Sequence, residues 1–397
     1  MAKSRGRGPT LAKDVNRMLI YRQLKQLRST TRIELSNLLQ LNKNTINSIV
    51  DELMAAGYVN EKGLSTTIGL GRKPVMIAFH AANKYAVGAT LSSAAIYWAV
   101  TDLYAKPVET FTTLLQDSSP ESMVEALCEG VQQLLERYPS SAWIGFDIGI
   151  PGQLNSERGV VLQSSHLQWN QVPFAELLGS RLSVPFRLDH SVKLAALGEL
   201  WHGFGREADN FAYCSFGDGV GCGIVMGGSL IRGEGNLAGE LGHIVIDPQG
   251  PLCRCGNRGC LEAIAGIPAI MERLYPIGER EKNLDSMNWL FEQLKKGNPA
   301  VEQDIRRTGG VIGRALSHIV NLINPRLIIC DGPLMLIADY LFPIIEEELA
   351  ACSTPPAYRH VQLVRSTLFP YTGCIGAAAS AIQDWESSVD PLELVSC

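Results

Sequence analysis

Apolar residues at helical spacing dominate the first 60 positions of the chain. Between Val15 and Leu27 they recur every three or four residues, which predicts a helix that packs inward by this face. The residues on the predicted inner face are Val15, Met18, Leu19, Leu24 and Leu27. Thr31 followed by Glu34 forms a capping-box pattern and predicts a short second helix that ends near Leu41. A tight turn would then lead to a third helix.

The predicted third helix has one apolar and one polar face. Asn42 can cap its start, and the apolar stripe for the core is Ile46, Ile49, Val50 and Leu53. The outer N-terminal face carries Lys43, Asn44, Thr45, Asn47 and Ser48. A short helix, a tight turn and a helix with such polar side chains are typical of the helix-turn-helix, whose second helix reads base edges. The alternative is a three-helix bundle whose polar face only meets water.

A predicted wing and a basic segment follow the third helix. Gly57 ends the helix, and Tyr58 begins a strand-like run. Arg72 and Lys73 then lie in a segment rich in glycine, just before the strand-like residues 75–79. Basic side chains in such a segment can enter a narrow, A·T-rich minor groove. We therefore predict a winged helix-turn-helix over residues 1–68 and a basic linker over residues 69–83.

Charge is distributed unevenly along the 397 residues. Residues 1–75 carry 13 Lys and Arg against 5 Asp and Glu, whereas the remaining residues carry 22 against 35. A basic module on an acidic chain favours a polyanionic partner such as DNA. No apolar run approaches the roughly 18 residues that a membrane helix needs, so we expect a cytoplasmic protein without a membrane partner.

Strand-like and helical runs alternate from Lys84 onward, which predicts an α/β body. The expected strands are 85–91, 96–103, 143–150, 212–216, 223–226 and 327–330, and the clearest helix is 120–137. The glycine-rich run 216–223 is similar to a loop that cradles phosphates, although glycine-rich hairpins are common and the signal alone is weak.

A histidine and three closely spaced cysteines form the strongest local pattern. His243 precedes Cys253, Cys255 and Cys260 in the chain. Three thiolates and one imidazole make a tetrahedral zinc site without an open position, so we predict structural Zn²⁺ rather than a metal that activates water. A disulfide is the alternative, but it fits a reducing cytosol poorly and leaves one thiol over.

Several motifs together resemble the ROK family, which combines bacterial sugar kinases with repressors such as xylose and N-acetylglucosamine repressors. The motifs are Gly149-Ile150-Pro151-Gly152, Leu197-Gly198-Glu199, the run from Ala238 to His243, and the cysteine cluster that continues into Leu261-Glu262. The resemblance implies a two-lobed, actin-like ATPase fold behind the winged helix-turn-helix. We expect lobes at 84–190 and 191–374, with a C-terminal helix at about 375–397 that helps to close the first lobe. It also implies a sugar held in the cleft by Glu240, His243 and Glu262.

The nucleotide and catalytic elements depart from the kinase pattern of that family. The Asn-Asp pair that supplies the kinase base corresponds to His190-Ser191, and the first phosphate loop reads Thr90 to Ala94 without its acidic and glycine residues. Asp218 replaces a threonine of the second loop, and 330–332 is more acidic and bulkier than the turn expected near adenosine. We therefore expect no catalytic residues, while His190 and Ser191 stay candidate effector contacts.

These observations predict a repressor of carbohydrate-utilisation genes, such as those for xylose. A homodimer or homotetramer would bind an inverted-repeat operator with A·T-rich flanks and respond to a sugar. Two alternatives stay open: an active sugar kinase with an incidental N-terminal domain, and a repressor whose effector is a sugar phosphate or a partner protein.

Overall fold

The computed structural model describes residues 9–64, 74–275 and 286–388. The chain divides into two compact units. The N-terminal unit comprises residues 1–85 together with 382–397, and the body comprises residues 86–381.

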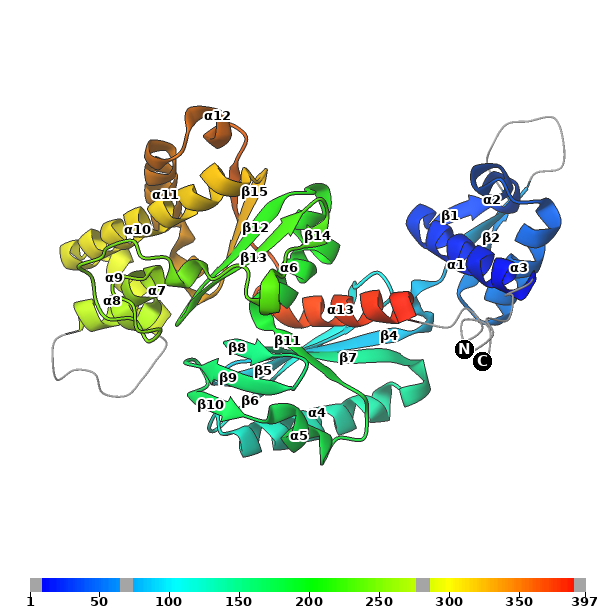
Figure 1. Ribbon diagram of the computed structural model, residues 1–397, viewed down its shortest axis with the longest axis horizontal. Helices are drawn as coiled ribbons and strands as arrows, with labels where there is room; N and C mark the ends of the chain where they lie inside the picture. Colours follow the sequence, from blue (N-terminus) through cyan, green and yellow to red (C-terminus); the bar gives the residue numbers. More distant parts are fainter. Residues whose placement is uncertain (1–8, 65–73, 276–285, 389–397) are drawn as a thin grey trace, which may run out of the picture. The chain divides into compact units, whose positions relative to one another are not determined.

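Helices and a small sheet make up the N-terminal unit (Figure 1). Its elements are α1 (Pro9–Leu27), β1 (Ser29–Thr31), α2 (Arg32–Leu39), α3 (Lys43–Ala55), β2 (Val59–Leu64), β3 (Val75–Phe79) and the 3₁₀ turn η1 (Ala81–Asn83). The strands pair antiparallel in the order β1-β3-β2. Thr31 caps α2 in a capping box with Glu34, as the sequence predicts.

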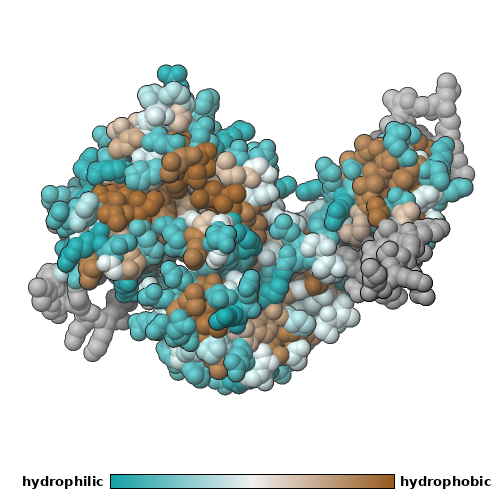
Figure 2. Space-filling model, in the orientation of Figure 1, coloured by the Kyte–Doolittle hydropathy of each residue, from teal (hydrophilic) through white to brown (hydrophobic). Residues whose placement is uncertain are grey.

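The inner face of α1 agrees with the predicted one at Leu24, which is fully buried, but differs at other positions. Val15, Leu19 and Leu27 are 57%, 41% and 40% exposed, whereas Arg17 and Tyr21 are buried. Arg17 is buried because its guanidinium pairs with both Asp14 and Glu52. Figure 2 shows a hydrophobic area on the visible face of this unit.

The predicted linker of residues 69–83 includes a strand of the N-terminal sheet. Val59 pairs with Phe79 and Leu64 with Val75, so the connection between the two wing strands spans residues 65–74. Strand β3 is needed to complete the sheet because it lies between β1 and β2. The N-terminal unit therefore extends to residue 85 instead of ending at residue 68.

The end of the C-terminal helix α13 (Thr372–Ser388) belongs to the N-terminal unit. The Trp385 ring stacks on Tyr58 at 6.4 Å and meets Tyr21 edge-on at 6.2 Å between centroids. Glu386 accepts hydrogen bonds from the Tyr21 hydroxyl at 3.1 Å and from Lys25 Nζ at 2.5 Å. Chain segments from both ends thus build one small core.

Two sheets of the same strand order form the body. The first lobe contains β4 (Tyr85–Leu91), β5 (Ala95–Thr101), β6 (Pro107–Leu114), α4 (Pro120–Arg137), η2 (Ser140–Ala142), β7 (Trp143–Ile150), β8 (Gln153–Asn155), β9 (Val160–Ser164), β10 (Trp169–Val172), α5 (Phe174–Gly179) and β11 (Arg187–His190). Its five-stranded sheet has the order β11-β7-β4-β5-β6, and β8 to β10 form a separate three-stranded sheet.

Written from its other edge, the first sheet has the order β6-β5-β4-β7-β11. The second lobe has the same topology, with the order β14-β13-β12-β15-β16. Its elements begin with α6 (Ser191–His202), η3 (Phe204–Glu207), β12 (Phe211–Phe216), β13 (Val220–Met226), β14 (Ser229–Leu230), η4 (Glu234–Asn236), η5 (Leu241–His243), α7 (Leu261–Ala265), α8 (Ile267–Leu274) and α9 (Ser286–Lys295). They continue with α10 (Pro299–Ile323), β15 (Leu327–Asp331), η6 (Pro333–Ile337), α11 (Ala338–Cys352), α12 (Pro355–Tyr358) and β16 (Gln362–Arg365). Both sheets combine antiparallel hairpins with parallel pairing, which in the second sheet joins β12 to β15 and β15 to β16. The predicted α/β body is confirmed.

Helices α6 and α13 pack backbone to backbone. A Cβ on Gly376 would come within 1.6 Å of the Leu194 carbonyl oxygen, and one on Gly198 within 2.4 Å of the Thr372 carbonyl oxygen. Only glycine permits such a close approach of the two helices. Helix α6 begins directly after β11 and lies beside the second sheet. His190 and Ser191 lie at this junction.

Candidate functional site

Helix α3 presents the polar face that the sequence predicts. Ile46, Ile49, Val50 and Leu53 are fully buried. Lys43, Asn44, Asn47 and Ser48 are exposed, and Thr45 is half-buried. The Asn42 side chain caps the helix by accepting from Thr45 N at 2.8 Å and from Thr45 Oγ1 at 3.1 Å. The amides of Asn44 and Asn47 are therefore the side chains of this face best placed to meet a ligand.

Arg72 and Lys73 lie outside the described residues. The ends of their segment are fixed by β2 and β3, so both residues belong to the connection between the wing strands. Their role in DNA binding stays a prediction.

His243, Cys253, Cys255 and Cys260 come together as one cluster. Their ligand atoms all lie within 4.8 Å of one another. Cys255 Sγ and Cys260 Sγ are 3.6 Å apart, too far for a disulfide, and Cys253 Sγ is 3.6 Å from His243 Nδ1. Gly259 turns the loop with φ at 71°, where a Cβ would overlap the Asp247 carbonyl oxygen.

The donor set fits a structural zinc ion. Burial, followed by hydrogen bonds with Cys255 and Cys253, raises the pKa of Cys260 to about 12. Thiols packed together in this way resist ionisation until a cation offsets their charge, and zinc binds thiolates. The four residues match the ROK structural zinc motif, so the cluster agrees with the predicted Zn²⁺ cofactor. When bound, the ion would hold the loop that carries Cys253, Cys255 and Cys260 against His243 of the second lobe.

The other ring nitrogen of His243 faces a predicted effector residue. His243 Nε2 lies 3.9 Å from Glu240 Oε2, while Nδ1 faces the thiol cluster. Glu262 lies in the first turn of α7, and its Oε2 accepts a hydrogen bond from Val220 N at 3.0 Å. One oxygen of Glu262 thus holds the glycine-rich turn.

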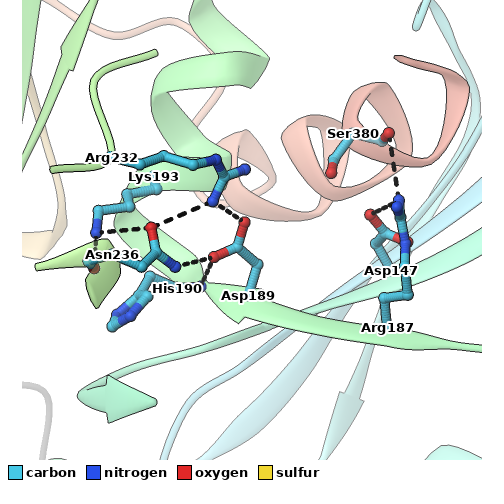
Figure 3. A network of polar contacts seen from close by, with 8 residues as sticks. All are labelled: Asp147, Arg187, Asp189, His190, Lys193, Arg232, Asn236 and Ser380. Carbon is cyan, nitrogen blue, oxygen red and sulfur yellow. Dashed lines mark hydrogen bonds and ion pairs between the residues drawn. The ribbon is translucent and has the colours of Figure 1, made fainter. Parts of the chain in front are cut away.

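His190 and Asp189 end β11 within a polar network (Figure 3). Asp189 accepts from Arg232 Nη1 at 2.6 Å, from Asn236 Nδ2 at 3.0 Å and from His190 N at 2.8 Å. Burial alone would raise the pKa of Asp189, but the Arg232 charge and these hydrogen bonds hold it below its usual value. The carboxylate therefore stays ionised and links the first lobe to the loop after β14.

Lys193, Arg232 and Asn236 complete this network, and sequence reasoning missed all three. The Lys193 ammonium is buried and donates to the backbone carbonyl and to Oδ1 of Asn236. Asn236 adopts a left-handed conformation with φ at 61°, which turns its oxygens toward the lysine. The glycines around Asn236 were the available sequence signal for such a loop.

Three residues in the segments that the sequence compares with kinase nucleotide motifs make contacts within the protein. Ser92 closes the turn after β4 by hydrogen bonds with both backbone groups of Ala95. Asp218 Oδ2 lies 3.6 Å from His166 Nδ1. Asp331 is buried and accepts from the hydroxyls of Tyr213 and Thr372, each at 2.6 Å, so its carboxylate serves the core.

Residues 92–384 match the ROK family, and the chain belongs to this family. A xylose repressor from Caldicellulosiruptor bescii is 26% identical over 94% of this chain and 97% of its own length. A crystal structure of a ROK family transcriptional regulator, described as a homologue of the Escherichia coli MLC protein, is 25% identical with a TM-score of 0.79 and covers 97% of this chain and 100% of its own. The two-lobed ROK fold that the resemblance implies is thereby confirmed.

Kinases of the family match a smaller share of the chain. A glucokinase from Thermotoga maritima is 28% identical over 67% of this chain and 86% of its own length. The repressor match therefore extends further along the chain than the kinase match. Within the described residues, no helix is both long and apolar enough to cross a membrane.

Proposed function

We propose that this protein is a sequence-specific DNA-binding repressor whose ROK body senses a carbohydrate. The carrying observation is the exposed polar face of α3, which stands on a well-packed helix in an N-terminal unit joined to a ROK fold. The match to a xylose repressor over 94% of the chain supports this reading. We propose that the genes it represses serve carbohydrate utilisation.

Base reading is assigned to the exposed face of α3. The proposed contacts are Lys43, Asn44, Thr45, Asn47 and Ser48 from α3, with Arg72 and Lys73 from the wing connection. Amide side chains can bond adenine at two points, whereas the cations neutralise phosphates or enter the minor groove. A homodimer or homotetramer would present two such helices to an inverted repeat.

The proposed effector site uses His190, Ser191, Glu240, His243 and Glu262. Carboxylates and an imidazole replace water around sugar hydroxyls because they supply paired acceptors and a donor. His190 and Ser191 end the first lobe and begin α6, while the other three come from the second lobe. A ligand between them would couple the two lobes and shift the population of DNA-binding states.

A direct binding experiment tests this function. Fluorescence anisotropy on labelled DNA from upstream of the gene should show specific affinity at about the nanomolar level. One carbohydrate among xylose, glucose, N-acetylglucosamine and their phosphates should weaken that affinity about tenfold. Binding that a random competitor removes equally well, under every condition, would contradict the proposal.

We further propose that the body does not phosphorylate its ligand. Ser191 stands where the kinases carry a carboxylate base, and Asp189 is committed to Arg232 and Asn236. Purified protein with ATP, Mg²⁺ and each sugar should form ADP no faster than a sugar-free sample. A ROK glucokinase in the same coupled assay is the positive control, and sugar-dependent ADP formation would restore the kinase alternative.

A further inference from the structure

We propose that the effector carries an anionic group, a phosphate or a carboxylate, that binds between Lys193 and His190. The inference rests on the proposed effector site and specifies the chemistry of its ligand. Two buried groups of the polar network carry it, and each has unused capacity for a ligand.

The Lys193 ammonium is a buried cation that, within the described residues, has no carboxylate in direct contact. The residue is only 3% exposed, and its ammonium donates to the two neutral oxygens of Asn236. Within the described ranges, no carboxylate oxygen lies within 4 Å of Lys193 Nζ. A buried charge is costly unless an opposite charge accompanies it, and the ammonium has three donors for two oxygens. An anionic ligand group would supply the missing partner.

The neighbouring acids do not fill this role. The oxygens of Asp189 are taken by Arg232, Asn236 and the backbone of His190. The charges of Asp189 and, to a smaller extent, Glu240 act on Lys193 from beyond contact distance. The charge of Arg232 opposes that of Asp189, and the Glu240 side chain is 44% exposed, so water screens it. The ion pair of Asp189 with Arg232 is internally neutral, so Lys193 leaves the network with a net positive charge.

His190 offers a second, independent contact. The residue is 7% exposed, and its Nε2 is buried without a hydrogen-bond partner. In Figure 3 the imidazole and the Lys193 ammonium flank Asn236, and both lie at the end of the network that is away from the pair of Asp147 and Arg187. Burial, and then the charge of Lys193, lower the pKa of His190, whereas a bound anion would reverse the second effect.

The network holds both groups in place before a ligand arrives. Asn236 is fixed by Asp189 through its amide nitrogen and fixes Lys193 through its oxygens. Gly233, which precedes it with φ at 69°, lies against Ala238 so closely that a Cβ would come within 2.9 Å. Such a loop presents a prepared site, because little conformational entropy is lost on binding.

Calorimetry on the full-length protein without DNA tests the inference. The probes are glucose and N-acetylglucosamine, their 6-phosphates, glucuronate, and inorganic phosphate alone. At least one charged sugar should bind about tenfold more tightly than its uncharged counterpart, as one charge-assisted contact provides. The phosphate and carboxylate arms then identify which anion the site accepts.

Variants of Lys193 connect the preference to this residue. Lys193→Met should remove the preference for the charged sugar, whereas Lys193→Arg should keep most of it. Lys106→Met is the matched control, because Lys106 is exposed and its side chain takes no part in the network. Melting curves show whether each variant is folded, and the arginine variant decides the case if the methionine variant is not.

Several results would overturn the inference. They are equal or tighter binding of the uncharged sugars, no binding of any charged probe, or a preference that survives in Lys193→Met. A failure of the proposed function looks different, because a charged sugar would bind in the calorimeter and yet leave DNA affinity unchanged.

Discussion

Replacement of both Asn44 and Asn47 by alanine is expected to weaken operator binding roughly 100-fold. Both amides are exposed on the outer face of α3, and the helix packs through other residues. Because base contacts specify sequence and phosphate contacts do not, affinity for unrelated DNA of equal length should stay within about twofold. Anisotropy with both DNA molecules measures the two affinities side by side.

The control for this double variant is Gln26→Ala. Gln26 is an exposed amide on α1, in the same unit but on another helix. Its replacement should leave operator affinity unchanged. A parallel loss on specific and unrelated DNA in the asparagine variant would contradict base reading by α3 and point to a general electrostatic contact.

Loss of the zinc cluster should weaken effector binding strongly but spare DNA binding. Cys255→Ser and Cys260→Ser each remove a predicted ligand of the zinc ion, and without the ion His243 would lose the metal contact that is expected to orient its ring. Because the other nitrogen of that ring faces Glu240, effector affinity should fall about tenfold or more. The melting temperature of the body should fall as well, since a structural metal stabilises its fold.

Metal analysis, calorimetry and anisotropy on each variant measure these effects. Wild-type protein should contain one zinc per chain, and the variants substantially less. Cys352→Ser is the control, because Cys352 is exposed on α11 and outside the cluster. Full zinc content in the two cluster variants, or unchanged effector binding after zinc loss, would contradict this account.

Local rules predicted the elements whose stability is local. Asn42 caps α3, Thr31 and Glu34 cap α2, and α4 spans Pro120–Arg137 as expected. The cysteine cluster was equally visible, because its ligands crowd into a short segment. Such features depend on neighbours in the sequence, and those neighbours can be read directly.

Long-range pairing explains what the sequence did not reveal. The predicted face of α1 was wrong in part, because Arg17 is stabilised inside by Glu52, 35 residues away, which the spacing of apolar residues cannot indicate. Lys193 and Asn236 are 43 residues apart and meet only through the fold. Residues 75–79 were predicted as strand-like but assigned to the linker, because their pairing with β1 and β2 is not visible in the sequence.

The N-terminal unit is built from both ends of the chain, and this affects when it can fold during synthesis. Trp385 and Glu386 complete a core that begins with Tyr21 and Lys25. A ribosome releases the first of these residues long before it adds the last ones, although domains ordinarily fold as they emerge. Polypeptides shortened by premature termination would lack the Trp385 and Glu386 side chains of this core. Operator binding would thus be expected mainly from full-length chains.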